Sequence, residues 1–144
     1  MKLLGSLAAA ALIGVAFVGP ALAADPVNLF FSVAHVKPEG TNSLGIVAQP
    51  GGRGVSESYT VQSVPVETKT GNVTTLSSIP QATGFGAAVT ARELKGNAVV
   101  ADVSYTVKKA GVTIVEATKT VRLEHGQSAD LAVMGAEKLV VSFQ

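Results

Sequence analysis

Two histidines, His35 and His125, are the side chains of this sequence best suited to acid–base chemistry or metal binding at neutral pH. His125 follows Glu124 and precedes Asp130, so three residue types that bind metals lie close together in the sequence. A stable site usually holds three or four ligands in fixed positions, and the chain has no H-x-H or H-x-x-x-H spacing. We therefore expect His125 to be a solvated turn residue and His35 to close an apolar strand with a satisfied ring.

The nucleophiles of covalent catalysis are missing or lack their usual surroundings. The sequence holds no cysteine, and no serine stands in a Gly-x-Ser-x-Gly elbow. A serine–histidine–carboxylate triad would have to use one of the two histidines. Glu57, Glu67 and Glu93 could in principle supply the carboxylate pair of a glycosidase. The polar surroundings of Glu57 and Glu67 favour solvated charges, and we expect no enzymatic activity.

The glycine-rich segment at residues 51–54 (GGRG) is the remaining candidate for ligand binding. A phosphate-binding loop would continue with Gly-Lys-Ser or Gly-Lys-Thr and would open a helix, and neither feature follows here. The segment is therefore predicted to be a turn or hinge. The sequence predicts no catalytic residue, no metal-binding residue, no cofactor-binding residue and no cofactor.

The N-terminus predicts export to the periplasm or outer membrane. Lys2 precedes an apolar stretch at residues 3–18, and residues 21–23 (ALA) place small residues at both positions before a cut. This is the pattern of a cleaved signal peptide, here residues 1–23. The alternative is an N-terminal membrane anchor, but the apolar stretch is shorter than the roughly 20 residues of a spanning helix. Cleavage leaves residues 24–144 as a single domain.

Charge and cysteine content restrict the function further. Without cysteine the chain has no disulfide framework, no thiolate metal site and no lipidated N-terminal cysteine, so a hydrophobic core must stabilise it. Removal of Lys2 from the eleven basic residues leaves ten, against ten acidic ones. These charges are dispersed, whereas a nucleic-acid-binding protein would be expected to carry a basic patch. We therefore expect no nucleic-acid partner.

Polar and apolar residues alternate through the C-terminal half, the mark of half-buried antiparallel strands. One strand has an apolar face of Val99, Ala101, Val103, Tyr105 and Val107 and a polar face of Asp102, Ser104, Thr106 and Lys108. The next has an apolar face of Val115, Ala117, Val121 and Leu123 and a polar face of Glu116, Thr118, Thr120, Arg122 and Glu124. Lys119 is the one charged residue on the second apolar face.

The whole mature chain is predicted to be all-β, an antiparallel sandwich or open barrel-like sheet of about seven to nine strands with little or no helix. Residues 28–36 are apolar on both faces, as in a strand buried between two layers. Pro65 within the strand at 56–68 predicts an edge strand or a bulge, because proline cannot donate to a ladder. The Ser/Thr/Gly-rich residues 69–84 are predicted to form a flexible insert. The other predicted strands are residues 44–48, 85–94, 97–108, 112–124, 129–134 and 139–143.

The order of several short motifs resembles a known family. They are residues 44–50 (LGIVAQP), 61–68 (VQSVPVET), 84–91 (GFGAAVTA), 96–99 (GNAV) and 121–127 (VRLEHGQ). In this order they are similar to the C-terminal secretin homology domain of bacterial secretion and pilus channels. That family has a Q-x-V-P segment, a polar gate insert and a final D-G-Q turn. This chain has His125 at the position of the Asp and Ala91 at the position of a family proline.

The resemblance implies a ring at the outer membrane, in which edge strands of one subunit pair with the next and residues 69–84 form a gate or contact loop. The expected function is that of an exported, non-enzymatic structural or interaction protein of the bacterial envelope, as a secretin-like component of a secretion or pilus system. The alternative is a stand-alone periplasmic or surface β-sandwich that binds a protein partner or acts in adhesion. The expected partner is another protein or a second copy joined through edge strands, with association to the outer membrane.

Overall fold

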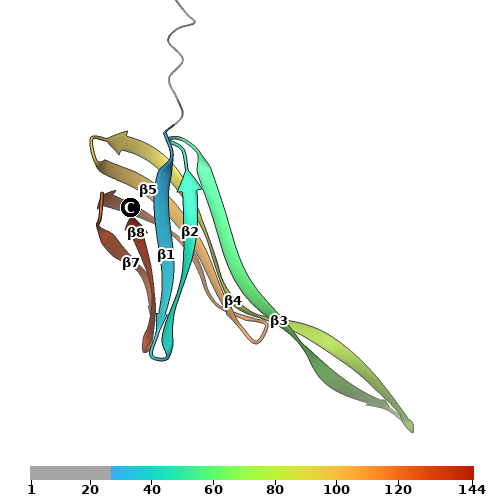
Figure 1. Ribbon diagram of the computed structural model, residues 1–144. Coiled ribbons are helices and arrows are strands. Elements are labelled where there is room, and N and C mark those ends of the chain that lie inside the picture. Colours follow the sequence, from blue (N-terminus) through green and yellow to red (C-terminus); the bar gives the residue numbers. More distant parts are fainter. Residues whose placement is uncertain (1–26) are drawn as a thin grey trace, which may run out of the picture.

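The computed structural model describes residues 27–144 as eight β-strands in two antiparallel sheets, which confirms the predicted all-β fold class (Figure 1). The predicted signal peptide, residues 1–23, lies outside the described residues. Within residues 27–144 no helix has the length and apolar character needed to cross a membrane. The strands are β1 (Leu29–Lys37), β2 (Gly40–Ala48), β3 (Arg53–Thr70), β4 (Val73–Lys95), β5 (Ala98–Lys109), β6 (Val112–Glu124), β7 (Ser128–Met134) and β8 (Glu137–Phe143).

The two sheets have strand orders β2-β1-β8-β7 and β3-β4-β5-β6. In the first sheet, the first strand of the described chain pairs with the last, and Phe31 lies opposite Phe143. Their rings stack with centroids 5.3 Å apart. In the second sheet, four consecutive strands form a meander. The pairing of β1 with β8 therefore joins the two ends of the described chain within a single sheet.

The core lies between the two sheets and is built from the alternating residues of each strand. The predicted inward set of β5 is buried, from Val99 with no exposed surface to Tyr105 with 6%. The phenol of Tyr105 donates a hydrogen bond of 2.9 Å to the carbonyl oxygen of Leu131 in β7, so the one polar atom this side chain buries is satisfied. The alternation of residues thus predicts the buried face of β5 correctly, and the opposite sheet supplies the acceptor for the hydroxyl of Tyr105.

Lys119, the charged residue on the apolar face of β6, lies where the other sheet stops packing against this strand. Val121 and Leu123 are buried as predicted, whereas Val115 is only half-buried and Ala117 is exposed. Lys119 lies between these two stretches and donates a hydrogen bond of 2.7 Å to the backbone carbonyl of Asp130. Because β7 stops covering β6 there, a long cationic side chain reaches the rim of the core and keeps its charge in water.

The prediction that residues 28–36 are buried on both faces is wrong. In β1 the side chains of Leu29, Phe31 and Val33 face the core, while Phe30 is 52% exposed and its neighbours on the outer face are only half-buried. The physical reason is the two-layer architecture, because no third layer covers the outer face of this sheet within residues 27–144. An apolar outer face is thus left facing solvent.

Residues 69–84, predicted as a flexible insert, are mostly paired strand. The ladder between β3 and β4 runs without a break from Arg53 opposite Thr90 to Thr70 opposite Val73. Gly71, with φ of 63°, begins the two-residue turn, in the pattern of a type II′ hairpin. The predicted edge position of Pro65 is confirmed, because β3 is the outermost strand of its sheet. The mobility of the segment stays a prediction.

The chain passes from one sheet to the other at a tight corner between β2 and β3. The amide of Gly52 donates a hydrogen bond of 2.7 Å to the carbonyl of Gln49, and this turn brings Gly54 against the backbone of Val47. A Cβ on Gly54 would overlap the carbonyl oxygen of Val47 and crowd the side chain of Ile46. The predicted turn at residues 51–54 therefore has a structural role at the corner.

We predict that Gly54→Ala lowers the free energy of unfolding by about 1–3 kcal/mol, because the added methyl group forces the two sheets apart at this corner. Gly45→Ala is the matched control, since a Cβ at Gly45 in β2 meets nothing within 4 Å. Urea denaturation of both variants measures the difference. Equal stability of the two variants would contradict the assigned contact.

Candidate interaction surfaces

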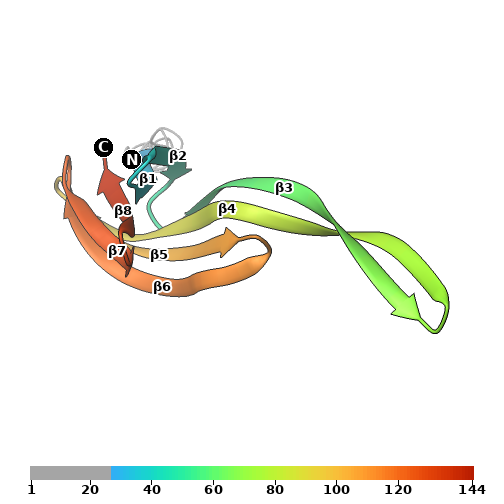
Figure 2. The ribbon, with the colours of Figure 1, turned by 90° about the horizontal axis from the view of Figure 1, so that it is seen from below.

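The most distinctive feature of the molecule is a two-stranded hairpin that projects from the body (Figure 1 and Figure 2). The last contact of β4 with β5 is Gly84 opposite Lys108, and beyond it β4 pairs only with β3. We call residues 60–83 the arm. At about 3.4 Å per residue its strands carry the turn at Gly71 roughly 35 Å from the body.

The root of the arm is fixed by the turn between β5 and β6. The amide of Ala110 donates a hydrogen bond of 2.9 Å to Oγ1 of Thr83, and the amide of Gly111 donates one of 2.9 Å to the carbonyl of Ala82. Ala110 has φ of 50° and is the only non-glycine residue among residues 27–144 with a positive φ. Left-handed alanine is strained by about 1–2 kcal/mol. The fold therefore tolerates local strain where the arm begins.

Prolines blunt both edges of the arm. Pro65 of β3 lies opposite Ser78, and Pro80 of β4 lies opposite Ser63. A proline has no N–H, so it fits an antiparallel pair without losing a ladder bond only where its nitrogen faces away from the partner strand. Each proline then removes a donor from an open edge, which disfavours addition of a further strand. The arm is better suited to contact a partner through a face than through an edge.

The two faces of the arm differ in charge. Glu67 and Lys69 lie on one face, together with Leu76, which is 76% exposed. The opposite face carries no charged side chain and continues, by the alternation of β3, the inner face of the sandwich. We call it the uncharged arm face. Its residues are Gln62, Val64, Val66, Thr68, Thr70, Val73, Thr75, Ser77, Ile79 and Gln81.

A second surface, uncharged over β1 and β2, lies on the outer side of the other sheet. Phe30 of β1 and Val47 of β2 are opposite each other and are 52% and 48% exposed. The outward residues that follow on β1 and β2 are small or β-branched, whereas Lys138 of β8 and Asp130 of β7 form an ion pair of 3.6 Å at the border of this surface. We call this surface the uncharged sheet face. Its residues are Phe30, Ser32, Ala34 and Val36 on β1, Thr41, Ser43, Gly45 and Val47 on β2, and Val140 and Ser142 on β8.

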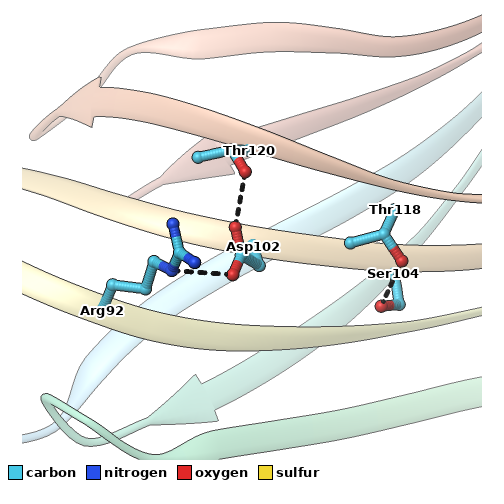
Figure 3. A network of polar contacts seen from close by, with 5 residues as sticks. All are labelled: Arg92, Asp102, Ser104, Thr118 and Thr120. Atoms are coloured by element: carbon cyan, nitrogen blue, oxygen red, sulfur yellow. Dashed lines mark hydrogen bonds and ion pairs between the residues drawn. The ribbon is translucent and has the colours of Figure 1, made fainter.

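The outer face of the β3-β4-β5-β6 sheet is polar by contrast. Asp102 of β5 pairs with the Nε atom of Arg92 at 2.9 Å and accepts a hydrogen bond of 2.6 Å from Thr120 of β6 (Figure 3). Beside it, the hydroxyls of Ser104 and Thr118 lie 2.9 Å apart (Figure 3). These contacts are exposed and add little to stability. They identify this face as one adapted to water.

A shallow trough of about 370 Å³ crosses the same polar face near the arm root. Its floor is low because β4 contributes Gly86 there, and its walls carry Glu57, Tyr59 and Glu116. Burial raises the pKa of Tyr59 above its ordinary value, and the nearby carboxylates of Glu57 and then Glu116 raise it further. The ammonium group of Lys108 lies 5.8 Å from the centre of the Tyr59 ring. The two glutamates face each other only because four strands align them, so sequence spacing gives no sign of this site.

A smaller cavity of about 260 Å³ opens between the sheets at the end nearer the arm root. His35, 4% exposed, lies in its wall, with Nε2 2.8 Å from the Glu137 carboxylate and its ring edge-on to Phe85. Because a carboxylate accepts, the proton of this bond belongs to Nε2 of the imidazole. Nδ1 is buried with no hydrogen-bond partner among the described residues. The expected satisfied ring is therefore satisfied at one nitrogen.

The candidate chemical residues do not converge. His35 lies opposite Leu139 near the start of β8, whereas exposed His125 rests against Phe143 at the end of that strand. Glu67 lies on the arm, away from Glu57 in the trough. Glu93 pairs with Lys95 at 3.4 Å near the far end of β4. Within residues 27–144 no group of three or more potential metal ligands forms.

Comparisons with protein-family models, curated proteins and solved structures found no match for this chain. The similarity to secretin homology domains therefore stays a prediction. The geometry of the arm and of the two uncharged faces is the remaining indication of function.

We predict that Tyr59 ionises above the ordinary tyrosine pKa of about 10. The folded chain favours the neutral phenol, so its contribution to stability is complete below that pH and is lost as the pH rises through the ionisation of Tyr59. Alkaline titration by tyrosinate absorbance measures this in Tyr105→Phe, which leaves Tyr59 as the sole tyrosine. Adding Glu57→Gln lowers the midpoint, whereas the control Glu67→Gln on the arm does not. Equal shifts in both would contradict the assignment.

We also predict that Glu137→Leu destabilises the fold by about 1–3 kcal/mol, because it leaves the buried Nε2–H of His35 without an acceptor. Adding His35→Phe removes the unsatisfied donor, so the double variant recovers part of the loss. Thermal or urea unfolding of both single variants and the double variant gives the coupling free energy. Strictly additive effects would show that the pair is not coupled.

Proposed function

We propose that this chain is an exported, non-enzymatic interaction protein of the bacterial envelope that contacts its protein partner through the arm. The arm is the single observation that carries the proposal. The signal peptide predicted at residues 1–23 supports export. The dispersed charges and the absence of a basic patch favour a protein partner over nucleic acid.

The energetics of the arm support a role outside the fold itself. From residue 67 to residue 80 every residue is exposed, so this outer part adds almost nothing to the core. A two-stranded hairpin alone is marginally stable in water, and ordering its backbone is opposed by conformational entropy. The strained Ala110 at the root adds a further local penalty. A contact made by the arm would offset these terms.

The position of the prolines refines how such a contact is made. The expected self-association through edge strands would need continuous N–H donors along an open edge. Pro65 and Pro80 interrupt the donors on the two edges of the arm. We therefore propose that the arm binds by its face, and that any strand pairing between subunits uses the edges of the body.

Removal of the arm should leave the fold intact and abolish the interaction. In this variant an Asn-Gly turn replaces residues 60–83 and links Tyr59 to Gly84. We expect its thermal unfolding to resemble that of the parent chain, because the deleted residues contribute little buried surface. Chemical cross-linking in intact cells, followed by mass spectrometry, should then yield partner adducts for the parent chain only.

A folded armless variant that keeps the same adducts as the parent chain would contradict this function. The substitution of Val112 in β6 by Lys serves as the control, because Val112 is 61% exposed and lies outside the arm. It should leave the adducts unchanged.

A secretin-like component and a stand-alone sandwich differ in what the cell fraction contains. Oligomers that resist heating in SDS and sediment with the outer membrane would favour the secretin-like role. A chain beginning at Ala24 and released as a soluble protein by osmotic shock would favour the stand-alone binding or adhesion role. Neither outcome depends on the identity of the partner.

A further inference from the structure

We infer that the partner of the arm is a second copy of this chain: the uncharged arm face of each copy packs on the uncharged sheet face of the other in a reciprocal two-fold exchange. The inference rests on the proposed function of the arm as a contact element. It adds the identity of the partner and the surface that receives the arm.

Each of these two surfaces holds a stretch of sheet without charge, and on the sheet face that stretch covers β1 and β2 and is bordered by the Lys138–Asp130 ion pair. A sheet face in contact with water normally carries polar and charged residues, as the Arg92–Asp102 pair on the other outer face does. The arm has Glu67 and Lys69 on one face and no charge on the other. On the sheet face, the outward residues of β1 and β2 include Phe30 and Val47 at about half exposure and no charged side chain. Both stretches consist mainly of small, β-branched and uncharged polar side chains.

The shapes of the two surfaces also match. Each is a stretch of antiparallel sheet, and two such sheets pack about 10 Å apart when their residues are small or β-branched. Val64 lies opposite Ile79 on the arm, and Ala34 lies opposite Ser43 on the sheet. Proline at both arm edges disfavours strand addition and leaves face packing as the available mode.

The two surfaces cannot meet within one chain. In both views the arm leaves the body at the far end of β3 and carries its tip away from the β2-β1-β8-β7 sheet (Figure 1 and Figure 2). The hydrogen bonds of Ala110 and Gly111 to Thr83 and Ala82 hold the root in this direction. A second copy can therefore receive the arm, whereas the chain's own body cannot.

The buried area favours a closed exchange over a single contact. A hairpin face about 35 Å long and roughly 10 Å wide covers about 350 Å², so one arm contact buries about 700 Å² in total. This is below the roughly 1,200–2,000 Å² of stable interfaces. Reciprocal exchange doubles the area to about 1,400 Å², within that range.

The absence of cysteine makes a direct test simple. Purified Ile79→Cys and Ala34→Cys variants are mixed and treated with a short bis-maleimide. We expect efficient cross-linking between the two variants, because Ile79 is on the uncharged arm face and Ala34 on the uncharged sheet face. The matched control pairs Leu76→Cys with Ala34→Cys, since Leu76 is on the opposite face of the same arm. Equal yields in the two mixtures would overturn the inference.

Sedimentation measures the strength of the same contact. Ile79→Lys places a charge in both copies of the contact and should weaken dimerisation by roughly 100-fold. Leu76→Lys on the other arm face should leave the dimer unchanged. A monomeric parent chain, an open polymer, or equal effects of the two substitutions would each overturn the inference. A monomer that still forms arm-dependent adducts with another protein in cells would overturn the self-exchange and leave the proposed function standing.

Discussion

The unbroken register between β3 and β4 is the constraint on which both the body and the arm depend. Its inner end, near Arg53 and Thr90, belongs to a sandwich sheet whose inner face is buried. Within residues 27–144 no other sheet packs against its outer end. Because side chains alternate strictly along a strand, the pattern that faces the core at Gly54 and Ser56 reappears on the arm at Val64 and Val66. The arm therefore continues the sheet beyond the region where the other sheet packs against it.

The fold class and the buried face of β5 can be predicted from the sequence, because polar and apolar residues alternate along a strand that has one face exposed to solvent. The same reasoning fails for β1, since apolar residues on both faces suggest a third layer and residues 27–144 provide none. The composition of residues 69–84 predicts a flexible insert and gives no sign of their strand pairing. Register with β3, rather than local propensity, makes that segment a strand, and register depends on pairs far apart in sequence. Lys119 interrupts the apolar face of β6 in the sequence, but the sequence does not identify the carbonyl of Asp130 that accepts its hydrogen bond.

The candidate surfaces were the least predictable part of the molecule. Tyr59 and Glu116 share a trough because four strands bring them together, and the His35–Glu137 bond joins the two strands at the centre of one sheet. Of the two prolines of the arm, only Pro65 is predicted from the sequence to mark an edge strand or a bulge. Their effect on both edges emerged only from the pairing of Pro65 with Ser78 and of Pro80 with Ser63. Because both edges carry a proline, the exposed hairpin is better suited to bind through a face than through an edge.

Hydrogen exchange of the arm amides over a range of protein concentration tests the central claim most directly, because a covered hairpin exchanges slowly and an uncovered one exchanges fast. We predict that residues 60–83 are protected at high concentration and lose that protection on dilution. The amides of β1 and β8 should keep their protection throughout. Arm exchange that is equally fast at every concentration, beside a protected body, would contradict it.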